Sequence, residues 1–131
     1  MTKLMENKKG LIMGLANDHS IAWGIAKALA DQGAQLAFTY QGEALKRRVE
    51  PLAQSLGSSF LLPCDVTDDD CMNVLFSCLK EEWGSIDFVV HAIAFSDKEE
   101  LKGRYVDTTA ANFDKTMRIS AYSFTDVCKR A

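Results

Sequence analysis

The chain has 131 residues, of which 47% are hydrophobic and 25% charged, a balance typical of one globular domain and unlike that of a disordered chain. Its net charge of −3 argues against general binding to nucleic acid or to an anionic membrane surface, so we expect neither as a partner. No apolar stretch is long enough to span a membrane, and the polar residues 1–9 contain no signal-peptide core. These features favour a cytoplasmic protein.

The four cysteines and two histidines are spaced too widely for a zinc site, so we expect free thiols in a reducing compartment and no bound metal. These residues are Cys64, Cys71, Cys78, Cys128, His19 and His91. We interpret His91 as a core histidine and His19 as a solvated loop residue rather than as catalytic bases.

Short apolar runs alternate with helical stretches along the whole chain. We predict strands over residues 10–13, 35–40, 60–64 and 86–91, and helices over 20–32, 43–56, 67–84 and from about 108 to the end. This order predicts an α/β fold, a Rossmann-type doubly wound parallel sheet, of which the chain holds the first half, about four strands with flanking helices. We interpret residues 1–131 as the N-terminal part of a single dinucleotide-binding domain whose remainder is absent from this chain.

Helical spacing also predicts which faces are buried. For the first helix, we expect the buried face to consist of Ile21, Ile25, Ala28 and Leu29, with Gly33 after its last turn. We expect Thr67 to cap the third helix, with Asp70 completing the cap. The last helix carries an apolar stripe, Phe113, Met117, Ala121, Phe124 and Cys128, and we expect this stripe and the edge of the fourth strand to be uncovered.

The loop between the first strand and the first helix has features suited to a phosphate group. Gly14 ends the strand, Ser20 opens the helix and Gly24 lies within its first turns. Glycine permits a tight turn and a close backbone approach, and a helix N-terminus presents unpaired N–H groups to an anion. The loop is longer than in the G-x-G-x-x-G fingerprint, and the structural alternative is a turn glycine beside an N-cap serine. Its position in a first βα unit favours pyrophosphate binding.

Gln41 follows the second strand, where an acidic residue commonly holds the ribose of NAD or an arginine accommodates the extra phosphate of NADP. Glutamine can still bond ribose, and Glu43 nearby would repel a 2′-phosphate. The sequence therefore favours NADH. The basic run over residues 46–48 keeps NADPH as the alternative.

Asp65 and Val66 follow the third strand and Ile93 follows the fourth, on the same sheet edge as Gly14. The Asp65 carboxylate beside the Val66 N–H matches the amino group and adjacent ring nitrogen of adenine. The alternative is an aspartate that only shapes a turn. If the adenine interpretation is right, all four strand ends contribute to one nucleotide site.

Tyr122 and Lys129 stand seven residues apart, a spacing that tyrosine–lysine pairs use in some reductases. Seven residues is also two helical turns, and this pair follows the fourth strand, one structural unit too early for such an active site. We interpret both as helix residues without a catalytic role.

From about Lys9 to Ala131 the chain resembles the bacterial NADH-dependent enoyl-[acyl-carrier-protein] reductase of type II fatty-acid synthesis, a divergent short-chain dehydrogenase/reductase. The resemblance rests on Gly14 with Ser20-Ile21-Ala22-Trp23-Gly24, on Ala37-Phe38-Thr39-Tyr40-Gln41, on Cys64-Asp65-Val66 and on His91-Ala92-Ile93-Ala94-Phe95. The extended first loop and the last segment replace the glycine-rich loop and Asn-Asn-Ala-Gly of ordinary members. The family commonly has serine, glycine and alanine where this chain has Ala92, Ala94 and Ser96.

By this resemblance, the cofactor contacts are Gly14, Ser20, Ile21, Gln41, Asp65, Val66 and Ile93, and the substrate contacts are Ala94, Phe95 and Ser96. The implied reaction transfers a hydride from NADH to a trans-2-enoyl thioester of acyl-carrier protein. The family's catalytic tyrosines and lysine follow a fifth strand, beyond Ala131, so this chain by itself is expected to be inactive. The family is a homotetramer that uses the helix carrying Tyr122 for packing and assembly.

Two alternatives stay open. One is a non-catalytic NADH-binding or assembly module, and the other is a carbonyl-reducing short-chain dehydrogenase/reductase. The missing Asn-Asn-Ala-Gly disfavours the second.

Overall fold

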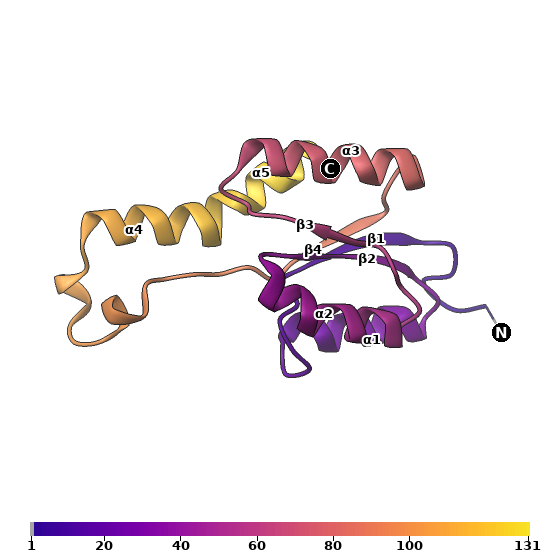
Figure 1. Ribbon diagram of the computed structural model, residues 1–131, viewed down its shortest axis with the longest axis horizontal. Helices are drawn as coiled ribbons and strands as arrows, with labels where there is room; N and C mark the ends of the chain where they lie inside the picture. The colour runs from indigo at the N-terminus through magenta and orange to yellow at the C-terminus, as the bar shows by residue number, and fades with distance from the viewer. Residues whose placement is uncertain (1) are drawn as a thin grey trace.

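A four-stranded parallel sheet forms the centre of the protein, with the strands in the order β3-β2-β1-β4 (Figure 1). The computed structural model describes residues 2–131. The strands are β1 (Lys9–Met13), β2 (Gln35–Tyr40), β3 (Leu61–Pro63) and β4 (Phe88–His91). The predicted α/β class and parallel sheet are confirmed, although β3 and β4 are shorter than the predicted strands.

Helices cover both faces of the sheet. They are α1 (Ile21–Asp31), α2 (Glu43–Ser55), α3 (Asp69–Trp83), α4 (Ala110–Met117) and α5 (Ser123–Arg130). Helices α1 and α2 lie on one face and α3 and α5 on the other, while α4 projects beyond the sheet (Figure 1). This arrangement is the doubly wound one, in which crossover helices bury a parallel sheet from both sides.

Strand β1 is buried on both faces because its side chains alternate between two cores. Leu11 and Met13 belong to the core under α3 and α5, whereas Ile12 belongs to the core with α1 and α2. At Gly10 a Cβ atom would lie 1.9 Å from the Phe88 ring, so the β4 side chain occupies the space above this glycine. Only glycine fits there without displacing that ring.

The predicted buried face of α1 is wrong for three of its four residues. Ile21 is 79% exposed, Ile25 and Ala28 are also exposed, and only Leu29 packs in part against the core. The buried side chains are instead Ala22 and Ala26. The helix is apolar nearly all round, so its pattern does not set its rotation, and alanines permit the closest approach to the sheet.

The ends of two helices test the capping predictions. Gly33 follows α1 with φ +95° and occupies the predicted position after its last turn. The Gly33 amide donates to Ala30 O and the Ala34 amide to Leu29 O, which is the Schellman arrangement. Thr67, however, does not cap α3. Asp68 does, accepting from the Cys71 amide at 3.1 Å, while the Thr67 hydroxyl donates to Asp65.

The last helical segment begins at Ala110, capped by Thr109, and is interrupted by a π-helical turn over Arg118–Tyr122. Its predicted apolar stripe is exposed: Phe113, Met117, Ala121, Phe124 and Cys128 all face outward, and α5 buries Ser123, Asp126 and Val127. Strand β4 is an edge of the sheet. The expected uncovered edge and stripe are therefore confirmed.

All four cysteines are free thiols, as expected. Over residues 2–131, no helix is long and apolar enough to cross a membrane, and no three histidine, cysteine or acidic side chains are grouped to hold a metal ion.

Candidate functional site

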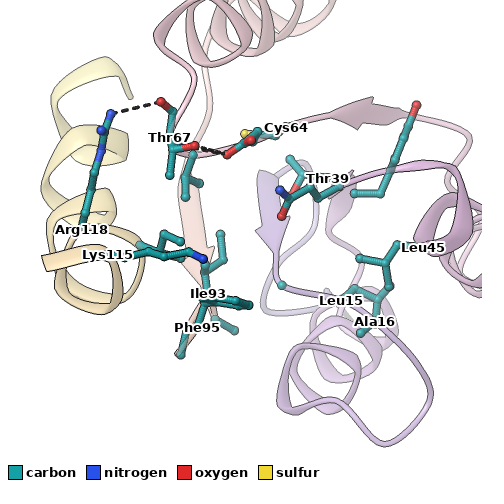
Figure 2. Close-up of a pocket in the computed structure, with 18 of the residues that line it drawn as sticks. Leu15, Ala16, Thr39, Leu45, Cys64, Thr67, Ile93, Phe95, Lys115 and Arg118 are labelled. Carbon is teal, nitrogen blue, oxygen red and sulfur yellow. Dashed lines mark hydrogen bonds between the residues drawn. The ribbon is translucent and has the colours of Figure 1, made fainter. Parts of the chain in front are cut away.

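A cavity of about 800 Å³ opens at the carboxyl ends of the four strands (Figure 2). Each strand contributes through the residues that follow it: Gly14 after β1, Gln41 after β2, Asp65 and Val66 after β3, and Ile93 after β4. Five of the seven predicted cofactor residues thus lie on one cavity wall or another. Ligands of open parallel sheets bind at this edge, where the strand order reverses.

Gly14 brings the first loop close to the strand beside it. Its φ is +99°, and a Cβ atom there would lie 2.0 Å from the Ala92 carbonyl oxygen. Both the backbone conformation and the absence of a side chain are required. Gly24, by contrast, has no neighbouring atom within 4 Å of a Cβ position, so only one of the two glycines is sterically required by the described residues.

Ser20 stands at the N-cap of α1, but its hydroxyl turns back into the loop. There it accepts from the amides of Ala16 and Asn17, both at 3.1 Å, and makes no bond to the helix. Ser20 therefore shapes the loop and leaves the first-turn N–H groups of α1 without a side-chain cap. In the described part of the chain, neither Ser20 nor Ile21 lines the cavity.

The loop after β3 holds the Asp65 carboxylate in one orientation. Both the Thr67 amide, at 2.9 Å, and the Thr67 hydroxyl, at 2.7 Å, donate to Asp65 Oδ1. Within residues 2–131, Asp65 Oδ2 and the Val66 N–H have no hydrogen-bond partner. Two consecutive residues that line the cavity therefore offer one free acceptor and one free donor.

The segment after β4 is fastened to the last helical segment. The Phe95 amide donates to Ser120 Oγ at 3.0 Å, and Ser96 Oγ accepts from Asn112 Nδ2 at 3.1 Å and Thr116 Oγ1 at 3.2 Å. Of the three predicted substrate residues, Ala94 and Phe95 line the cavity and Ser96 does not. The Ser96 hydroxyl is used to hold the loop.

The sequence analysis missed one wall of the cavity. Asp114, Lys115, Arg118 and Ile119, from α4 and the π-turn, line it opposite the sheet. The Lys115 ammonium lies 3.1 Å from Asp97 and 4.8 Å from the centre of the Phe95 ring. The only signal in the sequence was a pair of basic residues, three positions apart on one helix face. The sequence does not indicate where α4 packs, because a long loop precedes it.

Burial shifts the pKa of two titratable groups near the cavity in the direction that favours the neutral form. Burial, with the neighbouring Cys71 and Asp65, raises the pKa of the Cys64 thiol to about 12, so Cys64 is a poor nucleophile. Burial lowers the pKa of His91, whose Nε2 lies 2.8 Å from Ser123 Oγ and whose ring packs on Phe124. His91 does not line the cavity, and its contacts are those of a packed histidine.

Tyr122 and Lys129 lie away from the cavity. Tyr122 is 57% exposed, Lys129 is exposed, and neither lines the cavity walls. The geometry agrees with their interpretation as helix residues.

The doubly wound parallel sheet, with a cavity at the carboxyl ends of its strands, defines a Rossmann-type nucleotide-binding domain. A family model described as "Enoyl-(Acyl carrier protein) reductase" matches residues 14–131. The chain belongs to this enoyl-(acyl carrier protein) reductase family.

Individual relatives agree with this membership. The chain is similar to the enoyl-[acyl-carrier-protein] reductase [NADH] 2 of Rhizobium meliloti, with 64% identity over all of this chain and 49% of that protein. Among solved structures, FabI from Candidatus Liberibacter asiaticus superposes with a TM-score of 0.97 at 55% identity, covering 100% of this chain and 51% of that one. The reductase from Anaplasma phagocytophilum, solved in complex with NAD, gives 0.96 at 59%, covering 100% and 50%. The chain spans about half the length of the curated relatives it matches.

Proposed function

We propose that this chain is the cofactor-binding portion of an NADH-dependent enoyl-[acyl-carrier-protein] reductase of type II fatty-acid synthesis. The observation that carries the proposal is the single cavity to which all four strand ends contribute. Its volume, about 800 Å³, is within the range of small-molecule and cofactor sites.

The residues present fit a dinucleotide. Asp65 Oδ2 would accept a hydrogen bond from the adenine 6-amino group, and the Val66 N–H would donate to the adjacent ring nitrogen. Gln41 would bond the adenosine ribose. The loop of Gly14 and Ser20 would hold the pyrophosphate, because the uncapped amides of α1 and the helix dipole favour an anion there.

The residues that follow Gln41 favour NADH over NADPH. Glu43 lies in the first turn of α2, two residues after the exposed Gln41, and its carboxylate repels a 2′-phosphate. In the basic run over residues 46–48, Lys46 is the residue nearest to Gln41 in the sequence, and its ammonium lies 5.7 Å from the centre of the Tyr40 ring. NADPH is accordingly the weaker ligand.

When bound, NADH supplies the hydride that reduces the β-carbon of a trans-2-enoyl thioester. Ile93, Ala94 and Phe95 give the cavity an apolar lining after β4, where the nicotinamide and the acyl chain would lie. The described residues place no tyrosine–lysine pair there, since Tyr122 and Lys129 lie elsewhere. We therefore expect this 131-residue chain to bind NADH without turning over an enoyl thioester.

The remaining parts of the proposal concern partners and location. The substrate is carried by acyl-carrier protein, and the enzyme acts in the cytoplasm as a homotetramer. Support for assembly comes from the exposed apolar stripe that includes Phe113, Met117 and Phe124.

A calorimetric titration with NADH, at micromolar concentration of the 131-residue chain, tests the proposal. We expect binding, weaker binding of NADPH, and no oxidation of NADH above background with a crotonyl thioester. Failure to bind either nucleotide would contradict the proposed site, and turnover would contradict the expected inactivity. Tight binding by a stable monomer would favour the non-catalytic module. Activity of a chain of the relatives' full length on 3-oxoacyl but not enoyl thioesters would favour a carbonyl reductase.

A further inference from the structure

A π-helical turn interrupts the helical segment that forms the cavity wall opposite the sheet. It spans Arg118–Tyr122, and the Ser123 hydroxyl donates to the Ile119 carbonyl beside it. Single π-helical turns inside an α-helix are rare, and they occur often at functional sites. Here Arg118 and Ile119, the first two residues of the turn, both line the cavity.

Arg118 joins this wall to the loop after β3. Its Nη2 donates to the Thr67 carbonyl oxygen at 3.1 Å, across 51 positions of the sequence (Figure 2). Thr67 is the residue whose amide and hydroxyl both donate to Asp65 Oδ1. A continuous series of hydrogen bonds therefore runs from Arg118 through Thr67 to the Asp65 carboxylate.

The geometry points to Arg118 as a positioning residue for recognition of the adenine edge, acting through Thr67 on Asp65 and Val66. This inference rests on the proposed function, because it concerns the same nucleotide site. Thr67 occupies one oxygen of Asp65 and leaves Oδ2 free, and Arg118 holds Thr67 from the opposite wall. The site is then preorganised for a 6-aminopurine, which donates at position 6 and accepts at the adjacent ring nitrogen.

A second effect of Arg118 has to be separated from this one. The guanidinium lines the cavity, so its positive charge attracts any dinucleotide whatever its base. Lys115 lies one turn earlier on the same wall and also lines the cavity, but its ammonium bonds Asp97 and not the loop after β3. Lys115→Gln therefore removes an equal charge without breaking the series of hydrogen bonds.

The test compares two dinucleotides that differ only at the base: NADH and reduced nicotinamide hypoxanthine dinucleotide. Hypoxanthine has an oxygen at position 6 and a proton on the adjacent nitrogen. It therefore places an acceptor opposite the Asp65 carboxylate and a donor opposite the Val66 N–H. Affinities for the 131-residue chain are measured by calorimetry, with thermal melting as a check of folding. We expect the unsubstituted chain to prefer NADH by about tenfold or more, the effect of a hydrogen bond to a charged group.

Arg118→Gln is expected to lower this preference to about threefold or less, because Asp65 and Val66 lose their fixed arrangement. Thr67→Val removes the hydroxyl bond to Asp65 Oδ1 and keeps the amide bond, and it is expected to lower the preference in the same direction. Lys115→Gln is expected to weaken both dinucleotides by one common factor and to keep the preference. General loss of structure or of charge would likewise change both affinities and leave their ratio unaltered.

The outcomes separate this inference from the proposed function. If the unsubstituted chain binds neither dinucleotide, the proposed function and the inference are both overturned. If it binds NADH with the expected preference and Arg118→Gln keeps that preference in full, only the role of Arg118 is overturned. A lowered preference in Arg118→Gln and an unchanged one in Lys115→Gln support it.

Discussion

Replacing Gly14 by alanine tests whether the close approach of the first loop to β4 is essential to the site. In Gly14→Ala, the new Cβ would lie 2.0 Å from the Ala92 carbonyl oxygen and 2.6 Å from its carbon. Both are backbone atoms that no rotamer change can move away. The φ of +99° adds strain of about 1–3 kcal/mol for a residue with a side chain. Overpacking adds about 1–3 kcal/mol.

We therefore expect Gly14→Ala to lower the free energy of unfolding by about 2–6 kcal/mol, measured by urea denaturation. The matched control is Gly24→Ala. Gly24 lies in α1, its added Cβ would meet no atom within 4 Å, and alanine is the better helix former by up to about 1 kcal/mol. NADH titration is expected to show loss of binding in Gly14→Ala, because the clash with Ala92 displaces the loop that forms the proposed pyrophosphate site.

Two results would refute this reasoning. One is a Gly14→Ala protein whose free energy of unfolding lies within about 0.5 kcal/mol of the unsubstituted chain, the usual range of a surface change. The other is equal destabilisation by Gly24→Ala, which would show that the region tolerates no substitution, for reasons other than contact with Ala92.

Three further predictions address other parts of the molecule. Asp65→Asn replaces the carboxylate that we propose accepts a hydrogen bond from adenine, and we expect about tenfold weaker NADH binding by calorimetry with an unchanged affinity for nicotinamide mononucleotide. Equal loss for both ligands would contradict the adenine assignment. His91 has a lowered pKa in the folded protein, so stability falls as pH drops below the unfolded value of 6.5, where the unfolded chain binds the extra proton. Melting temperatures from pH 7.5 to 5.5 should fall more steeply for the unsubstituted chain than for His91→Gln, and parallel curves would exclude this linkage. Met117→Lys places a charge in the exposed apolar stripe, and sedimentation velocity should show less self-association than with Met117, unless the stripe plays no part in association.

The cavity wall provided by α4 and the π-turn shows where inference from the sequence ended. Parallel order of four strands implies that the residues after them share one edge, and Gly14, Gln41, Asp65 and Ile93 do share one cavity. No such rule exists for Arg118, the first residue of the π-turn, which lines the cavity because the long loop after β4 leads back to α4. Contacts between segments 51 positions apart leave no local pattern.

Local chemistry was also decided by competition that spacing does not reveal. Thr67 and Asp68 are adjacent, and both residue types are good N-caps. Asp68 caps α3, because the Thr67 hydroxyl donates to Asp65 instead. Ser20 likewise stands at the N-cap, yet its hydroxyl accepts from the loop and not from the helix. Each hydroxyl had two possible partners, and the fold of the neighbouring loop selected one.

By itself, the amino-acid sequence determined the class of fold, the order of its elements, the edge where the strand ends meet and the family to which the chain belongs. These follow from periodicity, turn residues and short segments, which act over a few positions. The tertiary structure alone decided the rotation of α1, with Ala22 and Ala26 inward and Ile21 outward, and the cavity wall formed by α4 and the π-turn. Both depend on how closely distant segments pack, and close packing is a property of the assembled core.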